Sequence, residues 1–465
     1  MIQQIINFFR RKNMMQDTNK LELELLIKSF LASQKLVEMN TAFDYYNDKH
    51  DILFRKKYGI GEHGERIELK HVANYKIVDN KYRSILLQKV NYLLSKRPTI
   101  TSNNEEYAEL LNNYFNKNFF KLLLNLGKDV YKYGISWLYV YYDSDGKLSF
   151  KIFDSREIIP VWIDREHNEL DKVIRIYTTN KFVGNEYKEI VNVEIYTKTG
   201  VSFGIWYNGI KSLSNEEPYF TIKGQPFLWK DHIPIIPFKA NESESTLLSK
   251  CKSIQDSINE LLSDFKNDME DSSRNTILVI KKYGGNDGSL RRNINLYGYI
   301  DVEEDGGVDT ISIEVNSENY KSILELLKNA MYENTKGIDA KSDRLGANPN
   351  QMNIQSMYSD IDLDANELER EFQTSIDKLL WFIDQDLLIF KKKNFIDDNV
   401  DIIFNRDIMI NESQSIEDCV KSLGILSKES IIAQHPWTGD VKVELERLNR
   451  EDAKKDELIG DLDSD

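Results

Sequence analysis

The chain has 465 residues, of which 41% are hydrophobic and 29% charged, and its formal net charge is −15. This length predicts about three domains, and the composition is typical of a globular protein rather than of a fibre or a disordered tail. No stretch approaches the roughly 18–20 consecutive apolar residues of a membrane-spanning helix. The only cysteines, Cys251 and Cys419, are far apart, which excludes a disulfide scaffold and a cysteine-rich zinc module.

The histidines show no metal-binding motif, and the N-terminus does not have the pattern of a secretory signal. The six histidines form no HxH or HExxH pattern, so the sequence predicts no metal site and no cofactor. The basic residues of MIQQIINFFRRK follow its short apolar run, whereas in a secretory signal they precede it. We therefore expect a protein of a reducing cytoplasm.

Charge is unevenly distributed along the chain. Lys and Arg minus Asp and Glu gives +6 for residues 1–240, −7 for 241–350 and −14 for 351–465. A surface of this overall sign repels DNA, so any contact with DNA has to be local or weak.

The first 240 residues combine helices with strands. Apolar residues step by three and four over 75–93, before Pro98, and again over 105–133, before Gly134. The period then changes to two, which predicts an antiparallel meander behind the helices and hence an α+β module. The predicted strands are SWLYVYYD, KLSFKIFD, EIIPVWID, KVIRIYTT, EIVNVEIYT and SFGIWYN.

Residues 245–271 have the pattern of a helix with two stripes. One stripe is apolar; the other is acidic, at strict i+4 spacing, where each adjacent like-charged pair costs a few tenths of a kcal/mol. Only Lys252 and Lys266 lie nearby in sequence to offset it. The acidic stripe is either a solvated helix face or a surface that has to stay anionic. It consists of Asp256, Glu260, Asp264 and Asp268.

Short strands and glycine turns follow over 272–316. The GGNDG run at 284–288 lacks the order of a phosphate-binding loop and leads into no helix, so we interpret it as a hairpin turn. A helix is predicted over 317–336, with Gly337 ending it.

The rest of the chain begins with a polar loop. Residues 338–353 include Gly346 and Pro349 and show no apolar period. A helical pattern over 356–392 would span about 55 Å if continuous. Shorter helices are predicted over 413–423, 427–434 and 440–456, and the acidic tail 457–465 is expected to be disordered.

Five sequence blocks, in this order, resemble the portal proteins of tailed bacteriophages, of the type found in siphophages of Gram-positive hosts. They are AFDYYNDKHDIL (42–53), the helix-like 74–98, 129–162, HIPIIPFKANESE with the helix that follows (232–264), and 404–451. The chain departs from the family pattern at 47–49, where a glycine is usual, and at Ala240, where a double asparagine is usual.

The resemblance implies a non-enzymatic ring, usually of twelve subunits, at one vertex of an icosahedral capsid. Such a ring is the channel for double-stranded DNA during packaging and ejection. It docks the terminase large subunit and later the head-completion or adaptor proteins, and it assembles with the major capsid and scaffolding proteins. The protein would then be part of the virion, present in the host cytoplasm during assembly, with no membrane partner.

The resemblance also implies a portal fold with named parts. These are an α/β wing (1–240), two stem helices (241–271 and 317–337), a small α/β clip (272–316), a tunnel loop (338–353), a long kinked wing helix with its return strand (354–404) and an all-α crown (405–456).

Two sets of site residues follow from that assignment. The acidic stripe would line the bore and repel DNA phosphates; the rival interpretation pairs it with cations of the adjacent subunit. Lys341 and Arg344 of the tunnel loop would touch DNA, with Asn348 and Asn350 as weaker candidates. Alternatively these cations are solvated or pair with Asp339 and Asp343.

Two other classes of function remain open at this point. Asp401, Asp407 and Glu412 could form a carboxylate site for a divalent-metal nuclease, although nothing in the sequence fixes their geometry. The chain could also be a monomeric scaffold for other proteins. Oligomeric state separates these classes, because a portal closes into a large ring.

Overall fold

The computed structural model describes residues 20–61, 63–70, 72–183, 186–222, 224–230, 232–272, 277–283, 300, 302–311, 316–339, 351–406, 412–438, 441 and 443–451. Helices and strands are mixed along the chain, which confirms the α+β class. None of the helices in these ranges is both long and apolar enough to cross a membrane.

Polar caps set the limits of the helices in the first half of the chain. Asn80 accepts the Arg83 N–H at 2.8 Å and so starts α3, and Asn116 accepts the Asn118 N–H at 2.9 Å and starts α5. Gly134, at φ +82°, ends α5 as expected. These helices are α2 (Gln34–Tyr46), α3 (Lys81–Leu94), α4 (Glu105–Tyr114) and α5 (Lys117–Tyr133), with a short 3₁₀ turn η1 (Asp51–Phe54).

Two helix predictions in this region were wrong in their limits. The first helix begins at Lys81 rather than at residue 75, because 75–80 is extended. The continuous run predicted over 105–133 is two helices, separated where Asn116 caps the second one.

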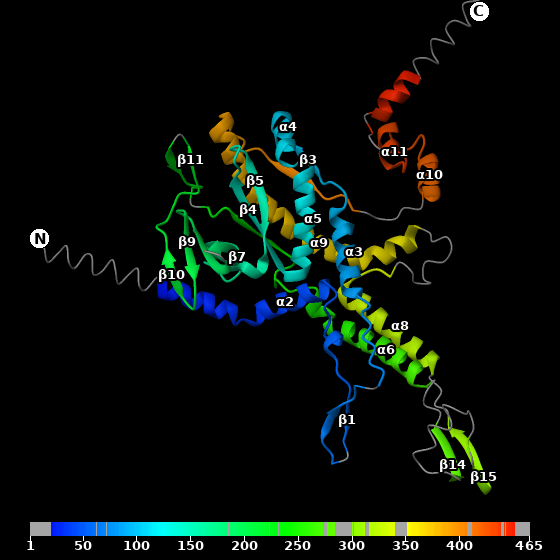
Figure 1. Cartoon of the computed structure of the whole chain (residues 1–465). Helices are drawn as coiled ribbons and strands as arrows, with labels where there is room; N and C mark the ends of the chain where they lie inside the picture. Colours follow the sequence, from blue (N-terminus) through cyan, green and yellow to red (C-terminus); the bar gives the residue numbers. More distant parts are fainter. Residues whose placement is uncertain are drawn as a thin grey trace, which may run out of the picture.

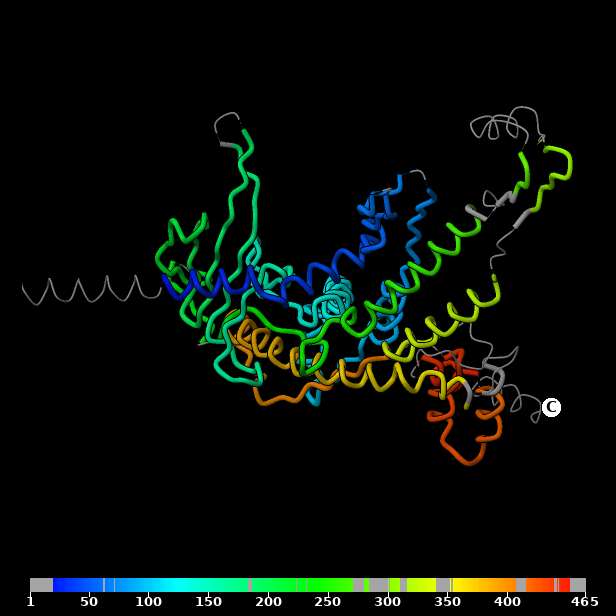
Figure 2. The backbone as a smooth tube through the Cα atoms, turned by 90° about the horizontal axis from the view of Figure 1, so that it is seen from below, coloured from blue at the N-terminus to red at the C-terminus, as the bar shows by residue number. Residues whose placement is uncertain are grey.

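Four of the six strands predicted for the meander lie in one sheet, together with a fifth strand that was not predicted. The five antiparallel strands lie in the order β10-β9-β8-β7-β6, and the β7–β8 hairpin extends well beyond the body (Figure 2). The strands are β6 (Ile158–Trp162), β7 (Leu170–Val183), β8 (Glu186–Thr197), β9 (Val201–Trp206) and β10 (Ile210–Leu213).

The first two predicted strands belong to a different sheet. Strands β4 (Ile135–Tyr142) and β5 (Leu148–Phe153) pair with β13 (Ile235–Lys239) in the order β13-β4-β5. Three smaller antiparallel pairs complete this part: β1 (Tyr58–Ile60) with β2 (Arg66–Glu68), β11 (Phe220–Ile222) with β12 (Gln225–Phe227), and β3 (Thr99–Ser102) with β16 (Val400–Ile403). A 3₁₀ turn, η2 (Ser155–Glu157), precedes β6.

The predicted long helix contributes a large part of the main core. Helix α9 (Gln351–Asp386) has 36 residues and continues into a π-helical turn (Leu387–Lys391). It packs against β13 and α3. Its buried apolar side chains recur at the helical period and join those of α3 and α5 in one cluster: Leu368, Phe372, Ile376, Leu379 and Ile383.

Two helices leave the body side by side. Figure 1 shows α6 (Lys252–Ser272) and α8 (Ser317–Thr335) running together toward the β14–β15 hairpin. Helix α6 begins later than predicted, after a 3₁₀ turn at Leu248–Lys250. Helix α8 ends as expected, although Lys336 rather than Gly337 takes the left-handed conformation (φ 52°). The hairpin consists of β14 (Ile277–Tyr283) and β15 (Val302–Ile311); the glycine turn at 284–288 lies outside the described residues.

The C-terminal helices lie near their predicted positions. They are α10 (Glu412–Lys421), α11 (Lys428–Gln434) and a helical stretch over 443–451. In Figure 1 they form a group of their own beside the body. The tail 457–465 lies outside the described residues.

Candidate functional site

One face of α6 carries a row of uncharged polar side chains that are completely buried. They recur at i+4 spacing and lie against residues 75–82, which comprise the extended segment 75–80 and the start of α3, and they form a row of hydrogen bonds with these residues. We call this row the polar ladder; it consists of Gln255, Asn259, Ser263 and Asn267.

The ladder satisfies the backbone of the extended segment. The N–H groups of Tyr75, Ile77 and Asp79 donate to Asn267 Oδ1 (2.7 Å), Ser263 Oγ (2.9 Å) and Asn259 Oδ1 (3.0 Å). The Tyr82 N–H donates to Gln255 Oε1 at 3.0 Å. Alternate residues of an extended chain repeat about every 6.6 Å and i+4 positions of a helix about every 6 Å, so the two rows stay in register. This match explains why the segment stays extended although its apolar spacing is helical.

His50 completes the ladder. Its Nδ1 accepts from Asn259 Nδ2 at 2.9 Å and its Nε2–H donates to the Tyr45 carbonyl at 3.1 Å, so the ring is neutral. Burial lowers the pKa of His50, against the opposing effect of the nearby carboxylates of Asp256 and Asp48. The ladder and His50 together attach α6 to the body.

The acidic stripe lies beside the ladder on α6, and its first member is half-buried. Asp256 accepts from the Tyr45 hydroxyl at 2.5 Å and from Lys252 Nζ at 2.8 Å. Burial and the hydrogen bond to Asp256 raise the pKa of Tyr45, so that its hydroxyl stays a donor.

The other three members are more exposed than Asp256. Asp264 forms an ion pair with Arg55 at 2.9 Å, and Asp268 accepts from the Tyr320 hydroxyl at 2.6 Å. Glu260 is exposed, and its carboxylate forms no hydrogen bond or ion pair with any residue that the structure describes. Lys252, nearby in sequence, pairs with the stripe as expected, and the fold also brings Arg55 to it from far away in sequence.

All four tunnel-loop candidates lie outside the described residues: Lys341, Arg344, Asn348 and Asn350. The chain on either side of this loop is described, and α3 holds it. Gln88 exchanges two hydrogen bonds with the backbone of Ile338, the first residue of the loop, at 2.8 and 2.9 Å.

After the loop, α3 holds α9 through a buried ion pair. Lys89, 1% exposed, lies 2.8 Å from Asp364 and also donates to the Lys336 carbonyl at 3.3 Å. Asp364 accepts a further hydrogen bond from the Tyr131 hydroxyl at 2.7 Å. Burial lowers the pKa of Lys89, and the Asp364 carboxylate opposes that effect. Lys89 therefore links the end of α8 with α9, the two elements between which the loop runs.

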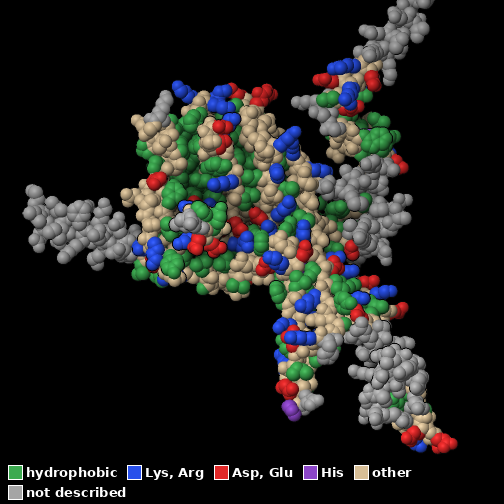
Figure 3. Space-filling model, viewed as in Figure 1, with side chains coloured by type: hydrophobic (Ala, Val, Ile, Leu, Met, Phe, Trp, Pro, Cys, Tyr) green, Lys and Arg blue, Asp and Glu red, His purple; other side chains and the backbone are tan. Residues whose placement is uncertain are grey.

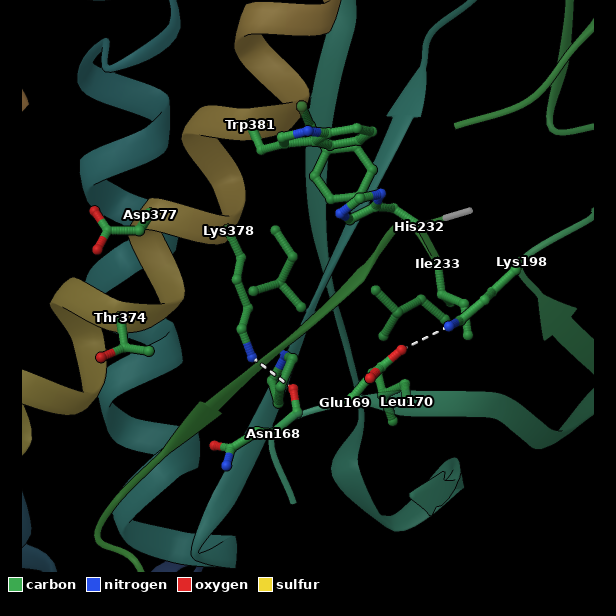
Figure 4. A pocket seen from close by; sticks show the side chains of 14 residues that line it. Asn168, Glu169, Leu170, Lys198, His232, Ile233, Thr374, Asp377, Lys378 and Trp381 are labelled. Atoms are coloured by element: carbon green, nitrogen blue, oxygen red, sulfur yellow. Dashed lines mark hydrogen bonds and ion pairs between the residues drawn. The ribbon is translucent and has the colours of Figure 1, made fainter. Parts of the chain in front are cut away.

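A cavity of about 690 Å³ lies between α9, β13 and the start of β7. In Figure 4, His232 stacks on Trp381, with ring centroids 3.7 Å apart, and Asp377 points away from them. Lys378 donates to the Asn168 carbonyl at 3.0 Å, and Lys198 pairs with Glu169 at 2.7 Å. These contacts engage Lys378, Lys198 and Glu169. Among the residues that line the cavity, all of them described, none is a nucleophile hydrogen-bonded to a base. The face of the body in Figure 3 is hollowed and has apolar side chains gathered there.

The carboxylates considered for a nuclease gain no support. Asp401 is exposed on β16, Asp407 lies outside the described residues, and Glu412 begins α10. Among the described residues, no group of three or more His, Cys, Asp or Glu is arranged to hold a metal ion.

Comparisons with known proteins agree with this architecture. The family model described as "Phage portal protein, SPP1 Gp6-like" matches residues 32–458. The portal protein of Bacillus phage SPP1 is 26% identical over 428 residues, covering 90% of this chain and 84% of that protein. The portal protein of Clostridium phage phiCD119 is 27% identical over 435 residues, covering 90% of this chain and 93% of that protein. The chain belongs to the SPP1 Gp6-like family of phage portal proteins, a structural rather than catalytic family.

Proposed function

We propose that this protein is the portal of a tailed bacteriophage, a ring at one capsid vertex through which double-stranded DNA enters and leaves. The family match over 32–458 carries this proposal. The architecture supports it, because α6, α8 and the β14–β15 hairpin extend from the body as one elongated arm (Figures 1 and 2). Arms of this kind, repeated around an axis, would form a tube.

In this proposal the ring has twelve subunits. It binds the terminase large subunit during packaging and a head-completion or adaptor protein afterwards, and it assembles with the major capsid and scaffolding proteins in the host cytoplasm. The parts take the names that the resemblance implies: wing, stem (α6 and α8), clip (β14–β15), tunnel loop, long wing helix and crown. The β14–β15 end of the arm would be the docking surface for the motor and the adaptor.

The acidic stripe of α6 is our proposed lining of the channel, with Lys341, Arg344, Asn348 and Asn350 of the loop closest to DNA. The exposure of Glu260, which has no partner in the described part of the subunit, supports an open anionic surface that repels phosphate. The pairing of Asp256 with Lys252 and of Asp264 with Arg55 weakens the charge at two positions of the stripe.

Charge reversal tests the channel lining. Glu260→Lys would place a ring of cations in the bore, and we expect it to slow DNA packaging in vitro at least severalfold, most strongly at low salt. Glu189→Lys, an exposed change on the β7–β8 hairpin, is the matched control. Equal packaging rates for the two variants and the unmodified protein would refute this position for the stripe.

Co-assembly tests the portal role itself. The protein would be expressed with the capsid and scaffolding proteins of its own phage, and the particles labelled with an antibody against it. We expect one labelled vertex per particle. Label spread over all vertices, or absent from every particle, would refute the proposal.

A further inference from the structure

The β1–β2 hairpin projects from the body with its apolar side chains uncovered. Ile60 is 85% exposed and shares one face of the hairpin with Tyr58, while Ile67 is exposed on the other face; Phe54, at the base, is 76% exposed. Isolated two-stranded hairpins are marginally stable in water, and neighbouring exposed apolar residues mark interaction surfaces. The hairpin therefore has the composition of a surface that another protein covers.

A second uncovered apolar surface lies on α8. This helix packs on α6 through Tyr320, whose ring centroid lies 4.9 Å from that of Phe265, and through its buried Met331. Leu326 (67% exposed) and Ile323 (47% exposed) flank this seam and face away from the subunit's own core.

These two surfaces lie on opposite sides of α6. In Figures 1 and 2, which view the molecule at right angles, α6 runs between the hairpin and α8. A ring built by rotation needs two different surfaces that fit each other, one on each side of every subunit. The hairpin and α8 meet that geometric requirement.

Their charges are complementary as well. Residues 54–70 carry five basic and three acidic side chains, whereas α8 carries three acidic and two basic ones. Lys and Arg side chains lie beside the apolar ones on the hairpin face in Figure 3. Opposite net charge favours hairpin-to-helix contact and disfavours contact between two α8 helices.

We propose that the β1–β2 hairpin of one subunit docks on the α8 face of the next subunit, with Ile60 packed against Leu326 and Ile323. This contact rests on the proposed ring, and it names the segments that close it. It also places the partner of the hairpin on a second copy of this chain rather than on a different protein.

Cysteine cross-linking tests the contact. The double variant Ile60→Cys/Leu326→Cys would be treated with a short bismaleimide, because the native Cys251 and Cys419 are buried. We expect a ladder of covalent multimers on a denaturing gel, since each subunit would link to neighbours on both sides. Ile60→Cys/Phe182→Cys, with the second cysteine at the exposed tip of β7, is the control and should give no ladder.

Particle mass, measured on the same samples, separates this contact from the ring itself. Rings without a ladder would refute the hairpin contact and leave the proposed function intact. Monomers without a ladder would count against both.

A substitution gives an independent readout. Ile60→Asp changes a side chain that is almost fully exposed in the single subunit, so the subunit should melt at an unchanged temperature. We expect the concentration needed for half-assembly to rise at least tenfold, while Phe182→Asp leaves it unchanged. Normal assembly of the Ile60→Asp variant would overturn the proposal.

Discussion

At the scale of single residues, the strongest claim concerns the buried Lys89–Asp364 pair. Removing one member of such a pair leaves the other charge buried without compensation, which costs about 3–5 kcal/mol. We expect Lys89→Met to lower the free energy of unfolding by that amount in denaturant titrations. Lys421→Met, which breaks an exposed i,i+4 pair with Glu417, should cost less than about 1 kcal/mol. Equal losses for the two variants would contradict the role assigned to Lys89.

His50 makes the stability of the fold depend on pH. Its pKa is lowered in the folded state, so below the unfolded value of about 6.5 the unfolded chain binds a proton that the folded chain does not. The stability that the neutral ring contributes is complete above that pH and is lost as the pH falls toward the lowered pKa. We expect unfolding temperatures to drop as the pH falls below about 6.5, and less steeply in His50→Gln. The exposed His63→Gln should keep the full dependence, and an identical pH dependence of His50→Gln and the unmodified protein would contradict this explanation.

At the scale of elements, the polar ladder predicts which backbone amides are protected. Ser263→Ala removes the acceptor of the Ile77 N–H and leaves that buried group unpaired, at a cost of about 1–3 kcal/mol. Amide hydrogen exchange should accelerate in 75–79. Ser257→Ala is the matched control, because that hydroxyl bonds only the Ser253 carbonyl of its own helix. Unchanged exchange in the Ser263→Ala variant would mean that the ladder does not hold the segment.

The helices and strands also show how much of the fold could be predicted from sequence patterns. The meander strands and α9 were predictable because their apolar periods are strong. The start of α3 was not, because 75–80 has helical spacing and is kept extended by α6, about 180 residues away. The ladder had a visible signal, an i+4 row of Gln, Asn, Ser and Asn, but nothing in that row says what it binds. Arg55 at the acidic stripe was unpredictable for the same reason.

At the scale of the whole molecule, the α+β class followed from the change of period along the chain, and the family followed from five short blocks in order. The candidate site was only partly within reach. The stripe was visible as spacing, whereas its partners Tyr45, Arg55 and Tyr320 depend on tertiary contacts. The surfaces proposed to join subunits became visible only once the hairpin and α8 could be seen on opposite sides of α6.

The most direct test of the central claim is the particle mass and symmetry of the purified protein, by light scattering with negative-stain imaging. A portal should give a closed ring with a central hole and a mass about twelve times the 54.4 kDa of one chain. A monodisperse monomer that stays monomeric with its own capsid and scaffolding proteins would contradict the account.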